Sequence, residues 1–280
     1  MRNAYASTVA AFGNEWQRFD QSTLAQDELD RLFASYFAVF PWDALPKDSS
    51  GFDAGCGSGR WAKLLARRVR HLHCVDASAE ALAVARRNLS GVANCTFHHG
   101  SVAELPFPDG SMDFGYSLGV LHHIPDTLEG LTAWVRKLKP GAPFLVYLYY
   151  AFDGRPAWFR AVWRAADGLR RVISALPRPA CYAASQLIAG LVYFPVARGA
   201  ALAERLGAKV HSMPSSAYRK LSSYSMRTDA LDRFGTRLER RFSRDEIAAL
   251  MTSSGLGQVT FHNGMARWCA VGIKTVSEPV

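Results

Sequence analysis

The sequence predicts an α/β fold: a doubly wound, mostly parallel seven-stranded sheet ending in an antiparallel hairpin, with a helical lead-in and a helical insertion. First, a glycine-rich turn, Gly55–Gly59, joins a short apolar run to a helical pattern, as at the start of a nucleotide-binding βαβ unit. Second, further strand candidates follow as far as residue 150, and the last is continuously apolar, like a buried parallel strand. Third, Asn263-Gly264 separates two β-like runs, which is a hairpin signal.

The spacing of the glycines restricts the class of ligand. Gly55, Gly57 and Gly59 stand two residues apart, so the third comes one residue earlier than in the dinucleotide pattern. Arg60 occupies the position of that later glycine. Asp53 would be a poor neighbour for a pyrophosphate and suits a ligand that carries an ammonium and a sulfonium group. The alternative is a glycine-rich surface turn, which the motifs downstream disfavour.

An acidic residue follows the turn at the spacing of a ribose-binding carboxylate. The strand candidate His71–Asp76 ends in Asp76, roughly twenty residues after the glycines, where a carboxylate accepts both ribose hydroxyls of an adenosyl group. Ser78 is the expected N-cap of a helix over Ala79–Leu89. The alternative for Asp76 is an acid of the N-cap region, and its position relative to the glycine turn favours the ribose role.

Several motifs, in order, resemble those of the class I S-adenosylmethionine (SAM) methyltransferases. Asp53–Gly59 reads D-x-G-x-G-x-G and resembles motif I. The run Gly100–Asp113 resembles G-D-A-E-x-L-P-F-x-D-x-S-F-D, except that Ser101 replaces the acid. Phe114–Pro125 is similar to the fourth strand and following loop of UbiE-like members. The resemblance covers residues 50–150 strongly and the C-terminal tail more weakly.

The resemblance implies SAM as the cofactor and assigns contacts to its methionyl part, ribose, adenine edge and pocket floor. The implied cofactor-binding residues are Asp53, Gly55, Cys56, Gly57, Gly59, Asp76, Ala77, Ser101, Val102 and Leu118. A hydroxyl accepts a hydrogen bond more weakly than a carboxylate. The adenine contact would therefore rest on Ser101 together with the backbone N–H of Val102.

Two histidines are candidates for a catalytic base. His122 and His123 follow the fourth strand, and the carboxyl ends of parallel strands face the ligand crevice. A neutral imidazole there could take a proton from an acceptor hydroxyl; the alternative is a loop histidine that shapes the pocket. Methyl transfer from a sulfonium is an in-line displacement to which alignment alone can contribute much, so a base need not exist. No metal site is expected, because the other histidines lack a cysteine or carboxylate at ligand spacing.

Five residues are candidates for the acceptor side: Trp16, Tyr147, Tyr149, Tyr150 and Arg227. Trp16 belongs to a segment that resembles the F-G-x-x-W run preceding motif I in some small-molecule methyltransferases, whose aromatic rings lie over the cofactor pocket. The three tyrosines end the fifth strand and are expected to form an acceptor wall. Arg227 either binds the acceptor or belongs to a surface ion-pair cluster.

The chain divides into four expected segments. Residues 1–49 form a helical lid, 50–150 the SAM-binding core, 151–242 a helical cap over the acceptor, and 243–280 the last helix and hairpin. Within the cap, a basic amphipathic helix is expected over Arg155–Leu176. Residues 180–197 carry no formal charge, and we expect a buried cap helix there rather than a membrane span. Peripheral membrane contact through residues 155–206 is the alternative.

The net charge and the cysteine content limit the possible partners and the cellular compartment. The formal net charge of +9 permits nucleic acid, an anionic membrane or an acidic substrate, and it selects none of them. Five cysteines without C-x-x-C pairs indicate a reducing compartment and no structural zinc. No signal-peptide pattern opens the sequence. We therefore expect a cytoplasmic protein, with a location peripheral to the inner membrane as the alternative.

The sequence thus predicts a SAM-dependent methyltransferase that acts on a small molecule such as a sugar, a lipid precursor or a secondary metabolite. No nucleic-acid partner is expected, because the N/D-P-P-Y/F motif of base-amine methylation is absent. The alternatives are a nucleic-acid methyltransferase, a SAM-binding scaffold without catalysis and, disfavoured by the glycine spacing, a nicotinamide oxidoreductase. The acceptor atom and the oligomeric state stay open.

Overall fold

The computed structural model describes residues 2–101, 104–152, 154–210, 216–262 and 268–276. The chain forms two compact units. The first consists of Met1–Thr23, Leu29–Ala151 and Leu238–Val280, and the second of Leu24–Glu28 and Phe152–Arg237. The second unit therefore contains most of the predicted insertion and also a short piece of the lead-in, whose Glu28 accepts a hydrogen bond from the Ser225 hydroxyl at 2.6 Å.

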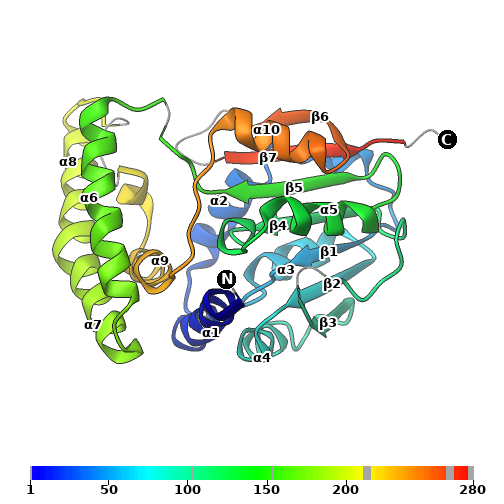
Figure 1. Ribbon diagram of the computed structural model, residues 1–280, viewed down its shortest axis with the longest axis horizontal. Helices are drawn as coiled ribbons and strands as arrows, with labels where there is room; N and C mark the ends of the chain where they lie inside the picture. The colour runs from blue at the N-terminus through cyan, green and yellow to red at the C-terminus, as the bar shows by residue number, and fades with distance from the viewer. Residues whose placement is uncertain (1, 102–103, 153, 211–215, 263–267, 277–280) are drawn as a thin grey trace. The chain divides into compact units, whose positions relative to one another are not determined.

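The first unit is built on a seven-stranded sheet with the order β3-β2-β1-β4-β5-β7-β6, which confirms the predicted fold class (Figure 1). Strands β1 to β5 are parallel to their neighbours, whereas β7 is antiparallel to both β5 and β6. The strands are β1 (Ser50–Ala54), β2 (His71–Asp76), β3 (Cys95–His99), β4 (Phe114–Leu118), β5 (Pro143–Leu148), β6 (Leu256–Phe261) and β7 (Trp268–Lys274). The Asn263-Gly264 step lies outside the described residues.

Helices follow the strands in the alternation that the sequence predicts. They are α1 (Arg2–Arg18), α2 (Gln26–Tyr36), α3 (Arg60–Leu65), α4 (Ala79–Asn88), α5 (Thr127–Lys137) and α10 (Arg244–Ser253). The expected N-cap at Ser78 is present, and α10 begins with a further cap. The Ser78 hydroxyl accepts the backbone N–H of Ala81, and Ser243 forms a capping box with Glu246. These contacts satisfy backbone donors that the first helical turn leaves open.

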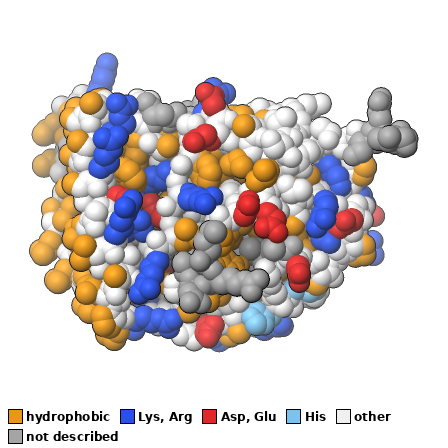
Figure 2. Space-filling view, in the orientation of Figure 1, with side chains coloured by type: hydrophobic (Ala, Val, Ile, Leu, Met, Phe, Trp, Pro, Cys, Tyr) orange, Lys and Arg blue, Asp and Glu red, His pale blue; other side chains and the backbone are white. Residues whose placement is uncertain are grey.

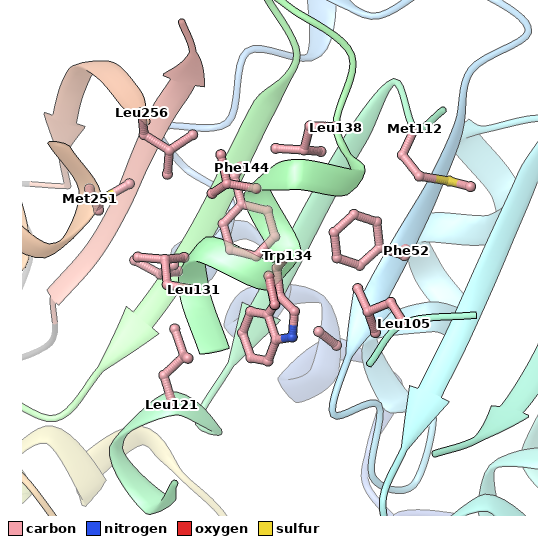
Figure 3. Close-up of a cluster of buried hydrophobic side chains, with 14 of the residues drawn as sticks. Phe52, Leu105, Met112, Leu121, Leu131, Trp134, Leu138, Phe144, Met251 and Leu256 are labelled. Carbon is pink, nitrogen blue, oxygen red and sulfur yellow. The ribbon is translucent and has the colours of Figure 1, made fainter. Parts of the chain in front are cut away.

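The core of the first unit lies between the sheet and the helices α5 and α10 (Figure 3). Trp134 of α5 is fully buried, and its ring centroid lies 6.0 Å from that of Phe144 on β5. Gly115 of β4 makes room for this packing, because a Cβ atom there would lie 2.5 Å from the ring of Phe52. The apolar strands thus hold the carboxyl ends of β1, β2 and β4 rigidly at one edge of the sheet.

The second unit is helical. It contains α6 (Ala157–Ser174), α7 (Arg178–Ile188), a π-helical turn (Ala189–Tyr193), α8 (Phe194–Arg205) and α9 (Ser223–Gly235). From α7 to α8 the chain runs as one helix of 28 residues, Arg178–Arg205. Its own core packs side chains of α6, α7 and α8 against Met226, Ala230 and Phe234 of α9.

The expectation of a buried cap helix over residues 180–197 is wrong. The helix Arg178–Arg205 has a window apolar enough to cross a membrane, yet only 28% of that window is buried. On α6, too, apolar side chains are exposed, and Trp158 is 53% exposed. One side of these helices packs on α9 and on the 3₁₀ turn Ser216–Lys220, and apolar side chains on the other side are exposed among the residues that the structure describes.

Candidate cofactor site

The glycine turn after β1 adopts backbone conformations that side chains disfavour. The φ angles of Gly55, Gly57 and Gly59 are +84°, +53° and +74°. A Cβ atom on Gly57 would also lie 2.8 Å from the Nε1 atom of Trp16. Both facts require glycine, since other residues are strained at positive φ and would not fit beneath the indole. The turn ends with Gly59 as the N-cap of α3.

Asp76, the last residue of β2, is held by backbone donors on both oxygens. The Gly57 N–H donates to Oδ2 at 2.8 Å, and the Ser78 N–H donates to Oδ1 at 2.8 Å. A carboxylate has about four acceptor positions, so each oxygen can still accept one more hydrogen bond. Burial raises the pKa of Asp76 above its ordinary value, and the two N–H groups oppose that rise.

A cavity opens where the carboxyl ends of β1, β2 and β4 meet α1. The residues that line the cavity are Tyr5, Thr8, Val9, Phe12, Trp16, Gly55, Gly57, Asp76, Ala77, Leu118, Gly119, Val120, His123 and Ile124. The structure thus brings Trp16, Gly55, Gly57, Asp76, Ala77, Leu118 and His123, all named from sequence, to one place.

Helix α1 contributes residues that the sequence interpretation missed. Tyr5, Thr8 and Val9 line the cavity together with Phe12 and Trp16. Their spacing follows one face of a helix. Extending the Phe12–Trp16 pattern by two turns toward the N-terminus would have found them.

Asp53 does not line the cavity. Its side chain is buried between β1 and β4, where the Tyr116 hydroxyl donates a hydrogen bond to Oδ2 at 2.8 Å. Burial raises the pKa of Asp53 to about 8, the Tyr116 hydrogen bond opposes the rise, and the nearby Asp76 carboxylate adds to it. The carboxyl therefore lies behind the glycine turn, and at neutral pH its protonated form predominates.

The two candidate histidines have different surroundings. His122 is fully buried with its ring stacked on Tyr149 at 3.7 Å, and neither ring nitrogen has a hydrogen-bond partner among the described residues. Burial lowers the pKa of His122 well below its ordinary value. His123 lines the cavity, and its Nδ1 lies 2.6 Å from the carbonyl oxygen of Leu238. That carbonyl fixes the proton on Nδ1 and leaves Nε2 as the basic nitrogen.

The tyrosines that end β5 lie away from this cavity. Tyr147 packs against Tyr36 with a ring separation of 5.1 Å, and Tyr149 lies between His122 and the guanidinium of Arg241. Tyr150 is buried, and its carbonyl oxygen accepts a hydrogen bond from Arg241. The rings of Tyr147 and Tyr149 pack against each other and against His122 of the 3₁₀ turn Leu121–His123.

Four remaining predicted residues also lie outside the cavity lining. Cys56 and Gly59 are buried in the glycine turn, and Ser101 is exposed. Arg227 of the second unit donates to the Gln186 Oε1 atom at 2.7 Å and to the Tyr182 hydroxyl at 3.3 Å, so it joins α9 to α7. Val102 is outside the described residues. Among the residues that the structure describes, no group of three His, Cys, Asp or Glu side chains could hold a metal ion.

Comparison with known proteins agrees with this geometry. Residues 52–146 match the family described as "Methyltransferase domain". A demethylmenaquinone methyltransferase of Bacillus licheniformis is 32% identical over 101 residues, which are 35% of this chain and 43% of that protein. A malonyl-[acyl-carrier protein] O-methyltransferase of Serratia marcescens is 26% identical over 184 residues, 63% of this chain and 67% of that protein. The chain thus spans less than half of the first relative.

The fold of the chain has counterparts among solved structures. One is a chain of the complex between the Haloferax volcanii Trm112 methyltransferase activator and a methyltransferase, with a TM-score of 0.53 at 15% identity. The alignment covers 95% of this chain and 99% of that one. At such low identity the likeness concerns the arrangement of strands and helices.

Proposed function

We propose that this chain, whose residues 52–146 form a class I SAM-dependent methyltransferase domain, transfers a methyl group from SAM to a small-molecule acceptor. One observation carries the proposal: the glycine turn, the Asp76 carboxylate and a face of α1 enclose a single cavity at the carboxyl ends of β1, β2 and β4. In open α/β sheets, ligands bind at this edge, outside the carboxyl ends of the strands.

The residues of the cavity fit the cofactor of this family. Gly57 gives the ligand access to backbone, because a side chain there would collide with Trp16. Asp76 keeps one acceptor position on each oxygen for the two ribose hydroxyls. The apolar side chains of Leu118, Val120 and Ile124 suit an adenine ring. SAM, when bound, supplies a methyl group that is already activated by its sulfonium.

His123 is our candidate for the group that accepts a proton, since its ring lines the cavity. Its Nδ1–H donates to the Leu238 carbonyl, which orients the ring and leaves Nε2 basic. Phe12 of α1 packs against the same ring at 4.9 Å and restricts its motion. His122 is the weaker candidate, because it does not line the cavity and its ring stacks on Tyr149.

A small acceptor is supported by the character of the relatives and of the site. The two relatives named above are, by name, a quinone-precursor methyltransferase and a methyltransferase of malonyl-[acyl-carrier protein]. The cavity is lined largely by apolar and aromatic side chains with few charged groups, which favours an uncharged or amphipathic molecule over a polyanion.

Titration calorimetry tests the first part of the proposal. SAM and S-adenosylhomocysteine should bind with micromolar affinity while NADH shows no heat; tight NADH binding without a SAM signal would reject the assignment. An acceptor screen tests the second part. Purified protein with methyl-labelled SAM should transfer label to members of a small-molecule panel and none to DNA or RNA. Labelled nucleic acid would instead establish the alternative acceptor class.

A further inference from the structure

The second unit exposes an unusual amount of apolar surface on two adjacent helical segments. On α6 the exposed side chains recur at the spacing of one helix face, and on the helix Arg178–Arg205 and its C-terminal end they form a second row. These side chains, each between 40% and 78% exposed, are Trp158, Val162, Leu169, Val172, Leu176, Leu187, Leu191, Val192, Phe194, Leu202 and Leu206. Soluble proteins rarely expose a contiguous apolar patch of this extent without a partner.

The main part of the second unit, residues 152–237, also carries the entire excess of positive charge of the protein. Residues 152–237 contain 14 Lys and Arg against 5 Asp and Glu, which equals the formal net charge of +9 of the full chain. The rest of the chain is therefore neutral overall. Figure 2 shows hydrophobic side chains gathered along the edge formed by α6–α8, with a column of Lys and Arg side chains beside it.

The acidic side chains of α6 and α8 are already neutralised within the unit. Asp167 pairs with Arg170 at 2.7 Å and with Arg171 at 2.9 Å. Glu204 pairs with Arg219 at 2.9 Å. Exposed arginines that form no ion pair with a described carboxylate remain on these helices: Arg164, Arg178, Arg198 and Arg205.

We propose that the α6–α8 face, defined by the eleven exposed apolar side chains and the four arginines, docks the protein peripherally on an anionic phospholipid surface. Apolar side chains enter the interfacial region while arginines meet lipid phosphates, the combination that holds amphipathic helices on membranes. Phe194 and Arg198 illustrate it, because the guanidinium lies 4.9 Å from the centre of the exposed ring.

The helix Arg178–Arg205 lies along the membrane in this proposal and does not cross it. Its other face is fixed in the core of the unit: Ser185 is fully buried, and Tyr193 stacks on Tyr218 at 5.1 Å. The Cys181 thiol also donates to the Phe234 carbonyl of α9 at 3.6 Å. Spanning a bilayer would require breaking these contacts, whereas lying on its surface covers only the side chains that are already exposed.

Charge complementarity favours lipid over the other possible occupants. A second copy of this chain would bring two strongly basic surfaces together, which like charges oppose. A nucleic acid would use the arginines but would leave rows of leucine and valine uncovered, since its backbone contacts are polar. An anionic bilayer would contact both the apolar side chains and the arginines of this surface. The proposal does not depend on the methyl acceptor, because none of these residues lines the cofactor cavity.

Vesicle flotation with the full-length protein tests the proposal. Vesicles of phosphatidylcholine with about one-third phosphatidylglycerol should bind the protein at low salt and release it at high salt, and pure phosphatidylcholine should bind at least tenfold less. Replacement of two exposed leucines, Leu187→Gln with Leu191→Gln, should weaken binding at least tenfold. The matched control is Leu128→Gln in α5 of the first unit, where the side chain is 39% exposed and binding should stay unchanged.

A second pair of variants tests the charge. Arg178→Gln with Arg198→Gln should weaken binding to the anionic vesicles, whereas Arg70→Gln, an exposed arginine of the first unit, should not. Unchanged thermal unfolding and unchanged SAM affinity show that each variant is folded. Absence of binding to anionic vesicles would overturn the proposal. Release by detergent alone would also overturn the proposal, because that result indicates an inserted helix. Loss of a dimer or of DNA binding in the same variants, without any change in vesicle binding, would overturn it as well.

Discussion

Tyr116 donates a hydrogen bond of 2.8 Å to the carboxyl of Asp53, its direct neighbour across the β1–β4 pair. The pair is fully enclosed by the sheet and its helices. The pair lies next to the glycine turn. The acid of motif I is therefore a buried group of the sheet. Its protonation state is therefore linked to the stability of the cofactor-free protein.

We expect the Asp53 carboxyl to make the cofactor-free protein less stable as the pH rises from about 4 to about 8. The pKa of Asp53 is about 8 when folded and 3.8 as an ordinary carboxyl. Between these values the folded state holds a proton that the unfolded state has lost, so the free energy of unfolding falls with rising pH, by at most about 1.4 kcal/mol per pH unit. Asp53→Asn removes this contribution and still accepts the Tyr116 hydrogen bond. The variant should thus gain stability relative to wild type from pH 5 to pH 8 in urea titrations.

A constant difference between the two proteins across that range would show that Asp53 is ionised in the folded state. The comparison uses the difference between wild type and variant, because His73, with a pKa lowered to about 4 chiefly by burial, contributes the opposite slope to both.

Asp76→Ala should weaken SAM binding. In the proposed role, the variant lacks the carboxylate that would accept hydrogen bonds from both ribose hydroxyls, and a hydrogen bond to a charged group contributes about 1.5–3 kcal/mol. We therefore expect the Kd for SAM to rise at least tenfold by calorimetry. Asp76→Asn, which keeps one acceptor oxygen, should lie between the two. An unaltered Kd in a folded Asp76→Ala protein would place the ribose acid elsewhere.

Gly57→Ala should abolish detectable SAM binding and destabilise the protein. The residue has a φ of +53°, and its new Cβ atom would meet the Trp16 indole at 2.8 Å. Gly110→Ala is the matched control, because Gly110 has a φ of +65° with no atom within 4 Å of the added Cβ. The control measures backbone strain alone, about 1 kcal/mol. SAM affinity should be unchanged in Gly110→Ala, and equal effects of the two variants on SAM affinity would argue against a ligand at the turn.

Substitutions of the two adjacent histidines should have different effects on turnover. His123→Phe removes the basic nitrogen at the cavity, and we expect turnover with an acceptor from the screen to fall by about 10²–10⁴. His122→Phe keeps a flat ring against Tyr149 and should change stability by less than about 1.5 kcal/mol while turnover persists. Steady-state kinetics and urea titrations measure both. Full activity in His123→Phe would mean that alignment without a base suffices.

Much of the first unit could be predicted from sequence. The glycine turn, the acid that ends β2, and the caps at Ser78 and Ser243 are local patterns whose causes lie within a few residues. No known motif marks Tyr5, Thr8 and Val9; they could be reached from sequence only by extending the helix face of Phe12 and Trp16 toward the N-terminus, and the docking of α1 over the strand ends brings that face to the cavity. The motif predicts that Asp53 contacts the ligand. The position of Asp53 in the motif does not reveal which face of β1 its side chain occupies, and in the structure that side chain meets Tyr116.

The sequence by itself determined the order of strands and helices, the glycine turn and the acid that ends β2, since each depends on backbone preference and short-range hydrogen bonding. Only the tertiary structure decided which of two adjacent histidines meets the cavity, because one turn of loop directs His123 inward and stacks His122 on Tyr149. It also decided that the apolar helix Arg178–Arg205 is largely exposed. Hydropathy reports how apolar a segment is, whereas burial depends on whether another part of the chain covers that segment. In the second unit, α9 and its neighbours cover one side of this helix.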